Sequence, residues 1–185
     1  MTSPRLFLVV PETLTAAQTL ACVTAACTAG DVASIAVPPA LLSATTKALQ
    51  DWGLAVLSTG APGANCDGMH LTAEGGVAAA RAAVGKNGIV GVYCAASRHA
   101  AMEAAESGAD YIAFSQNAYV PKEPIVGWWV DVFEIPCVAF DPVEPKDLDI
   151  LLPQKPDFMR PSDAMWESPE AATRIVAELM QRLTA

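Results

Sequence analysis

The stretch IVGVYCAASRHAAMEAAESGADYIAFSQ, residues Ile89–Gln116, decides the fold. Its first part, Ile89–Cys94, is an apolar run of strand length, and the alanine-rich Ser97–Ser107 predicts a helix that stops at Gly108. Asp110–Phe114 (DYIAF) is a second apolar strand. Both strands are continuous apolar runs rather than alternating ones, which is typical of parallel strands covered on both faces. The stretch therefore predicts a strand, a crossover helix and a parallel strand.

The same alternation extends over the rest of the chain. Further strands are expected at Arg5–Val10, Val32–Val37, Leu54–Leu57, Gly68–Leu71, Pro136–Phe140 and Phe158–Met159. Further helices are expected at Thr15–Ala29, Ala40–Trp52, Gly76–Val84, Val126–Glu134, Pro145–Leu152 and Ser168–Thr184. The last of these carries an apolar stripe, which predicts a face packed on the core: Ile175, Val176, Leu179, Met180 and Leu183.

Alternation of strands and helices throughout a chain predicts a parallel sheet covered by helices. Eight candidate strands favour a single, compact (β/α)8 TIM barrel over residues 1–185, since no linker or low-complexity segment divides the chain. Such a barrel is smaller than the usual ~250 residues. An open doubly wound sheet is the alternative, but no glycine-rich dinucleotide motif follows the first strand.

Composition narrows the class of function. The net charge is −9 and the 11 basic residues form no run, which argues against a nucleic-acid partner. No apolar run reaches the ~18 residues that a membrane span needs, so no membrane partner is expected. The 5 cysteines show no paired CxxC spacing, as expected of reduced thiols in a cytoplasmic protein. The oligomeric state stays open, with a homodimer as one option.

Four stretches resemble the thiamine phosphate synthase and thiazole tautomerase superfamily. Cys66–Leu71 (CDGMHL) is similar to the family's DGVHLGQ segment, and Ile89–Gln116 is similar to its IGVSTHS, helix and GADYIGFGP segments. Arg5–Val10 (RLFLVV) resembles the family's first strand, LYLIT, and Ile135–Phe140 (IPCVAF) stands where the family has IPVVAIGG. The resemblance implies a barrel enzyme that transfers a pyrimidine-methyl group from its diphosphate to a thiazole phosphate with Mg²⁺, releasing pyrophosphate.

The resemblance also implies which residues form the site around a small phosphorylated heterocycle. Lys122 and His70 take the catalytic positions, and Glu74 is the implied ligand of Mg²⁺, which prefers oxygen donors. The implied substrate-binding residues are Asp67, Ser115, Gln116, Arg160 and Ser162. The last two fall in the loop of the last strand, where the family holds a phosphate.

Other positions depart from the family pattern. Gly75 stands where the metal-binding aspartate is expected, and Ser34–Pro39 lacks the basic residues that hold the diphosphate. Ala95 replaces an imidazole after the fifth strand. Asp141 and Pro142 replace a phosphate-binding glycine pair, and proline has no N–H to donate. Because each electrostatic contact can be worth ~10²–10³ in rate, we expect impaired or altered catalysis.

Three functions remain open at this point. The first is a family enzyme with altered chemistry on a small phosphorylated heterocycle. The second is a non-catalytic phosphate-ligand-binding or interaction protein on the same barrel. The third is a barrel enzyme of another class that reuses Asp67, His70 and Lys122.

Overall fold

The computed structural model describes residues 3–73, 76–115 and 124–184. Its eight parallel strands are hydrogen-bonded in sequence order, and the last strand pairs with the first, so the sheet is a closed barrel. The strands are β1 (Arg5–Val9), β2 (Val32–Val37), β3 (Ala55–Thr59), β4 (Gly68–Leu71), β5 (Ile89–Tyr93), β6 (Tyr111–Phe114), β7 (Cys137–Val143) and β8 (Phe158–Pro161). The predicted (β/α)8 barrel is confirmed, and the open sheet is excluded.

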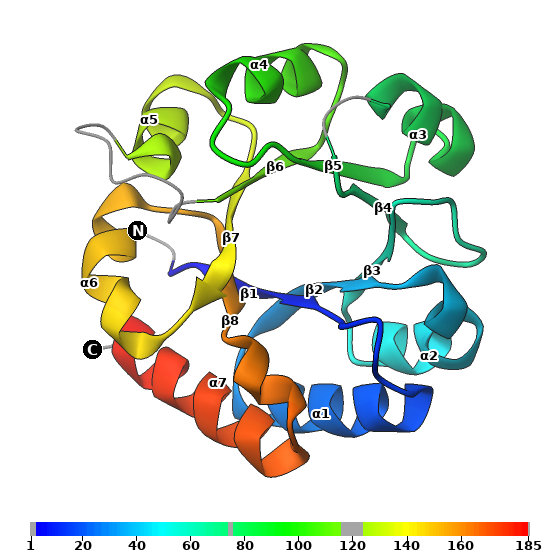
Figure 1. The fold of residues 1–185 in the computed structure, drawn as a ribbon, viewed down its shortest axis with the longest axis vertical. Helices are drawn as coiled ribbons and strands as arrows, with labels where there is room; N and C mark the ends of the chain where they lie inside the picture. The colour runs from blue at the N-terminus through cyan, green and yellow to red at the C-terminus, as the bar shows by residue number, and fades with distance from the viewer. Residues whose placement is uncertain (1–2, 74–75, 116–123, 185) are drawn as a thin grey trace.

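Helices surround the ring of strands on its outside (Figure 1). In the described part of the chain they are α1 (Ala16–Ala29), α2 (Pro39–Asp51), α3 (Val77–Val84), α4 (Arg98–Glu106), α5 (Ile125–Val132), α6 (Leu148–Leu151) and α7 (Pro169–Thr184). Residues 60–67 join β3 to β4 without a helix, as their turn-rich sequence indicates. This missing helix accounts for part of the small size of the barrel.

The predicted helix Pro145–Leu152 is divided into shorter pieces. A 3-10 turn at Pro145–Asp147 leads into the short α6, and a second 3-10 turn follows at Leu152–Gln154. Pro145 stands in the first turn, where a helix needs no N–H from it, whereas Pro153 lacks the N–H that would continue α6. The α-helical part therefore ends at Leu151.

Helices α1 and α7 pack together over the seam between β8 and β1 (Figure 1). Helix α1 begins at a capping box, in which the Thr15 side chain accepts from the Gln18 N–H and the Gln18 side chain accepts from the Thr15 N–H. The predicted stripe of α7 faces inward, with Ile175, Val176 and Leu179 buried. The same apolar cluster includes Cys22, Val23 and Ala26 of α1.

An aspartate stands immediately before each even-numbered strand, at the amino rim of the barrel. These residues are Asp31, Asp67, Asp110 and Asp157. Three of the carboxylates accept a backbone N–H from the start of the preceding strand: Asp67 from Val56 (2.8 Å), Asp110 from Val90 (2.7 Å) and Asp157 from Cys137 (2.8 Å). Asp31 instead pairs with the Arg5 guanidinium of β1 at 2.8 Å. Each aspartate therefore ties its own strand to the one before it.

The interior of the barrel is filled by large side chains that alternate with small ones. Phe7, Leu57 and Tyr111 are buried there, and their cluster also includes Ala36, Ala113 and Val138. The Tyr111 ring lies across Gly91 of the neighbouring strand. A Cβ at position 91 would stand 1.9 Å from the Tyr111 Cζ. Only glycine leaves room for the tyrosine at this height of the barrel.

All five cysteines lie in the described part of the chain, and none of them is bonded to another. No helix in residues 3–73, 76–115 and 124–184 combines the length and apolarity needed to cross a membrane. Cys22, Cys94 and Cys137 are buried, Cys27 and Cys66 are half-buried, and all are free thiols. Burial raises the pKa of Cys27 to about 11 and, with the Asp157 charge as a second cause, that of Cys137 to about 12.

We expect Gly91→Ala to lower the free energy of unfolding by at least about 2 kcal/mol, because overpacking a filled core costs about 1–3 kcal/mol. Urea unfolding of the variant and the parent protein measures this difference. Gly127→Ala is the matched control, since a Cβ there meets only ordinary contacts at 3.6 Å or beyond in helix α5. It should be neutral or stabilising by up to about 1 kcal/mol. Equal stabilities of the two variants would show that the Tyr111 ring does not need the space.

Candidate functional site

Side chains from four strands meet inside the carboxyl end of the barrel and form what we call the carboxyl-end cluster. They are His70 on β4, Tyr93 on β5, Phe140 on β7 and Arg160 on β8. The His70 and Phe140 rings stack with their centroids 4.9 Å apart, and the Tyr93 ring centroid lies 5.1 Å from that of Phe140. The Arg160 guanidinium lies 5.3 Å from the Phe140 centroid, over its face. The cluster therefore combines one cation, one imidazole and two aromatic rings.

The His70 imidazole is buried and neutral. Its Nδ1 lies 2.7 Å from the Tyr111 hydroxyl. Burial first, and the positive charge of Arg160 second, lower the pKa of His70 to about 4. Burial, and then the negative charge of Asp110, raise the pKa of Tyr111, so the phenol keeps its proton. The Nε2 atom of His70 has no hydrogen-bond partner among the described residues.

The Arg160 guanidinium is held on two sides. Its Nη2 donates to the Asp163 carboxylate at 2.6 Å, and its Nη1 donates to the Phe140 carbonyl at 3.5 Å. The side chain is only 17% exposed, and its Nε is buried without a partner among the described residues. A buried guanidinium N–H without an acceptor costs free energy, which an anionic oxygen of a ligand would recover. This is the donor type that proteins use for phosphate.

A second polar pair lies at the carboxyl ends of β6 and β7. The Ser115 hydroxyl lies 3.0 Å and 2.9 Å from the two carboxylate oxygens of Asp141, to which it donates. Strand β7 continues through Asp141 and Pro142 to Val143, which pairs with Pro161 of β8. The chain is therefore extended at the position where the family resemblance implies a phosphate-binding glycine turn.

The described residues do not fit a Mg²⁺ site. Among them, no three His, Cys, Asp or Glu side chains are grouped so that they could hold a metal ion. Two described carboxylates beside the cluster already have partners, since Asp141 accepts from Ser115 and Asp163 pairs with Arg160. The implied ligand Glu74 lies outside the described residues.

Several residues predicted from the sequence come together at this end of the barrel. His70, Ser115 and Arg160 lie at the carboxyl ends of their strands, and Ser162 precedes the short turn Asp163–Trp166 that follows β8. Arg160 belongs to β8 itself rather than to the loop after it. Three further predicted residues fall outside the described part of the chain: Glu74, Gln116 and Lys122. Their roles remain predictions.

Asp67 is the predicted residue that the structure does not bring to this cluster. It precedes β4 and therefore lies at the amino rim, whereas His70 lies toward the other end of the same strand. Its carboxylate accepts from the Val56 N–H at 2.8 Å and from the Gln50 Nε2 at 3.2 Å. Aspartates before the other even-numbered strands occupy the same position. These contacts give Asp67 a structural role in joining β3 to β4.

Sequence reasoning did not select four of the residues that shape the site. Tyr93, Tyr111, Phe140 and Asp141 line or support the cluster. Alternation along each strand places Tyr93 on the same side as Gly91, and Phe140 on the same side as Val138. This alternation could have identified Tyr93 and Phe140 as inward-facing residues from the sequence. It could do so only if one inward-facing residue of each strand were already known.

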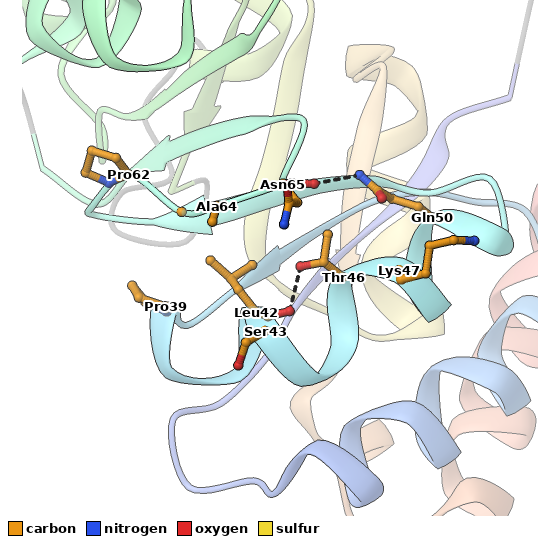
Figure 2. A pocket seen from close by; sticks show the side chains of 10 residues that line it. Pro39, Leu42, Ser43, Thr46, Lys47, Gln50, Pro62, Ala64 and Asn65 are labelled. Atoms are coloured by element: carbon orange, nitrogen blue, oxygen red, sulfur yellow. Dashed lines mark hydrogen bonds between the residues drawn. The ribbon is translucent and has the colours of Figure 1, made fainter.

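A separate pocket of about 470 Å³ lies outside the ring, between α2 and the loop 60–67 (Figure 2). The Gln50 Nε2 donates a hydrogen bond to the Asn65 carbonyl at 3.0 Å, which links α2 to the loop. The Thr46 hydroxyl donates to the Leu42 carbonyl within α2 at 2.8 Å. None of the predicted site residues lines it. The pocket occupies the place where a helix between β3 and β4 would pack.

Comparison with known proteins identifies relatives of one enzyme type. The family model described as thiamine monophosphate synthase matches residues 50–154. A thiamine-phosphate synthase of Rhodospirillum centenum is 33% identical over 202 residues, covering 96% of this chain and 97% of that protein. One of Erythrobacter litoralis is 40% identical over 124 residues, covering 60% of this chain and 58% of that protein. The match therefore spans just over half of the second relative and nearly all of the first.

Solved structures show the same fold. Thiamine phosphate pyrophosphorylase from Pyrococcus furiosus superposes with a TM-score of 0.78 at 16% identity, covering 97% of this chain and 95% of that one. (S)-3-O-geranylgeranylglyceryl phosphate synthase from Thermoplasma acidophilum superposes with a TM-score of 0.70 at 14% identity, covering 98% and 93%. At these identities the likeness concerns the fold alone.

We expect acid to destabilise the protein through His70. The unfolded imidazole titrates near 6.5 and the folded one near 4, so the unfolded state binds more protons as the pH falls between these values. Stability that is present above pH 6.5 is therefore lost on acidification, by about 2 kcal/mol at pH 5 for one group with this shift. Urea unfolding at pH 7.5 and pH 5.0 measures the loss. In His70→Asn the loss should shrink by that amount, and an unchanged loss would contradict the buried neutral imidazole.

Asp67→Ala should lower the free energy of unfolding by about 1–3 kcal/mol, because the Val56 N–H loses its acceptor at the barrel rim. Asp51→Ala is the control, since the exposed ion pair of Asp51 with Lys47 should change stability by less than about 0.5 kcal/mol. Both variants should bind phosphorylated ligands as the parent protein does. Loss of ligand binding in folded Asp67→Ala would restore Asp67 to the site.

Proposed function

Because the chain belongs to the thiamine monophosphate synthase family, we propose that its carboxyl-end cluster binds a thiazole phosphate or a similar small phosphorylated heterocycle. One observation carries the proposal. Two buried nitrogen atoms of the cluster, the Nε of Arg160 and the Nε2 of His70, have no partner among the described residues. Both side chains contact the Phe140 ring, since His70 is stacked on it and the Arg160 guanidinium lies over it. A ligand with an anionic end and a polar ring atom would satisfy both nitrogens.

The cluster residues take complementary parts in this proposal. Arg160 donates to a phosphate oxygen, and its partner Asp163 keeps the guanidinium in place. Phe140 and Tyr93 contribute apolar ring surface beside the heterocycle. With its Nδ1 facing the protonated Tyr111 phenol, the neutral imidazole of His70 presents Nε2–H toward a polar atom of the ligand. The aromatic walls exclude water, which strengthens each of these polar contacts.

We further propose that the chain carries out the family reaction slowly. In that reaction a pyrimidine-methyl group leaves its diphosphate, joins the thiazole phosphate, and pyrophosphate is released. The described residues supply one cation at the cluster and no group of metal ligands. Strand β2 ends at Val37 and is followed by Pro38 and Pro39, without a basic residue for the diphosphate. Because each missing electrostatic contact can cost ~10²–10³ in rate, turnover should fall well below that of a synthase with all of them.

A non-catalytic binding protein is the second candidate, and the Asp141 carboxylate favours it. This acidic group stands at the end of β7 beside Ser115, at the rim where a second phosphorylated substrate would have to enter. A carboxylate there repels a diphosphate, whereas a single phosphate bound by Arg160 on β8 can lie away from it. The protein would then bind one phosphorylated ligand without joining it to another.

The two candidates are separated by measuring pyrophosphate release from the pyrimidine diphosphate and thiazole phosphate, with Mg²⁺, at micromolar protein. Slow, Mg²⁺-dependent release supports the synthase, and its absence alongside calorimetric binding of thiazole phosphate supports the binding protein. Neither release nor binding would overturn both proposals.

Arg160→Ala should weaken binding of thiazole phosphate at least tenfold in isothermal titration calorimetry, because a hydrogen bond to a charged group is worth about 1.5–3 kcal/mol. Arg174→Ala is the matched control: this arginine is exposed on α7 and pairs with Glu178 at 3.6 Å, away from the cluster. It should bind as the parent protein does. Equal weakening in both variants would show that binding reflects overall charge rather than the site.

A further inference from the structure

A second cavity opens at the amino end of the barrel, opposite the carboxyl-end cluster. It has a volume of about 310 Å³. Its inner walls are the side chains of Phe7, Leu57, Ile89, Tyr111, Val138 and Phe158. Ile89, Tyr111 and Phe158 are the first residues of their strands, which places the cavity mouth at the amino rim. The cavity exists because the neighbouring inward positions at this level carry small residues, Ser34 and Ala55.

The chemistry of this cavity differs from that of the cluster. Its inner walls are aliphatic and aromatic apart from Ser34, and its charged residues, Arg5 and Asp110, lie at the mouth. Arg5 is engaged with Asp31 at 2.8 Å, and Asp110 is engaged with Arg81 at 2.5 Å and with the Val90 N–H. Neither charge needs a ligand to satisfy it. The rim aspartates at the same end disfavour an anion, so a phosphorylated substrate does not suit this cavity.

We propose that the amino-end cavity is a binding site for a small, uncharged aromatic molecule. A dry apolar cavity of about 150 Å³ holds benzene, and ligand pockets begin at about 300 Å³. The observed volume therefore suits one planar molecule of two fused rings. Phe7, Tyr111 and Phe158 provide ring faces and edges for it, and burial of its apolar surface supplies the binding free energy.

A ligand bound in this cavity would also affect the carboxyl-end cluster. The Tyr111 ring lines the cavity, and its hydroxyl is bonded to the Nδ1 of His70 at 2.7 Å. The same ring lies directly against the backbone of Gly91. A ligand that shifts the phenol therefore shifts the hydrogen bond of His70. One side chain connects the amino-end cavity to the carboxyl-end cluster.

The probe for the test is indole, which is neutral and has two fused rings. The chain has two histidines, His70 in the barrel and His99 on the exposed face of α4, so the imidazole NMR signals report both places at once. Titration with indole should shift the His70 signals saturably and leave those of His99 unchanged. An absence of any His70 shift up to the solubility limit of indole would overturn the proposal.

Cavity-filling variants locate the bound indole. Ala55→Leu should weaken its affinity at least tenfold, because the added side chain occupies the cavity. Ala21→Leu makes the same change on the exposed face of α1 and should bind indole unchanged. Ser34→Leu fills the cavity from β2 and replaces Ala55→Leu if that variant does not fold. Undiminished binding in a folded cavity-filling variant would place indole elsewhere and refute the site.

Competition experiments distinguish indole binding in the amino-end cavity from binding in the carboxyl-end cluster, on which the proposed function rests. Thiazole phosphate and inorganic phosphate should change the affinity for indole only up to a limit, because the two sites are separate and any coupling through Tyr111 saturates. An apparent dissociation constant for indole that rises in proportion to the concentration of either compound, without a limit, would place indole in the carboxyl-end cluster and overturn the amino-end site. Failure of thiazole phosphate to bind at all would count against the proposed function and leave the indole result intact.

Discussion

The hydrogen-bonded pairing of β8 with β1 is the interaction on which the rest of the structure depends. It joins Phe158 to Arg5 and Met159 to Leu6, residues from the two ends of the chain, and turns an open sheet into a ring. Helices α1 and α7 cover this seam with a shared apolar cluster. Closure of the ring also brings Arg160 of β8 and His70 of β4 into the same interior. In an open sheet these two strands would lie far apart and no cluster would form.

The interior of the ring is organised around one tyrosine. Tyr111 reaches from the amino-end cavity to His70, and Gly91 provides the space for its ring. Burial lowers the pKa of His70 and raises that of Tyr111, so both side chains are uncharged at neutral pH. An uncharged pair is the arrangement that costs least in an interior without water. It also leaves the imidazole as a hydrogen-bonding group rather than as a second cation beside Arg160.

The fold is that of the family, whereas several residues differ from the site pattern that the resemblance implies. The DGxH core of the family pattern is present at Asp67, Gly68 and His70, but its two polar residues serve opposite ends of the barrel. Asp67 belongs with the aspartates that tie strands together at the amino rim. At the carboxyl rim, Asp141 introduces a negative charge where the resemblance implies phosphate-binding glycines. The transferase and the binding protein are therefore distinct proposals, which differ in whether a second phosphorylated ligand binds.

Local patterns of the sequence determined the elements and their order. The apolar runs Val32–Val37 and Gly68–Leu71 predict β2 and β4 with the observed bounds, because a buried parallel strand needs apolar side chains on both faces. Strand–helix alternation favours the barrel, and the resemblance places His70, Ser115 and Arg160 at its carboxyl end. The predicted strand Pro136–Phe140 stops short of Val143, however, since the extension of β7 depends on Ser115 and on pairing with Pro161.

Only the tertiary structure decided which polar atoms have partners. The sequence contains Asp67, Arg160 and His70 but does not show that the first is bonded to β3, or that the other two each keep one buried nitrogen without a partner among the described residues. Local sequence patterns also do not predict the lining of the amino-end cavity, because this lining includes the first residues of strands that are spread along the chain. Periodicity reports which face of an element is apolar. Hydrogen bonds and cavities depend on which distant residues the closed ring brings opposite one another.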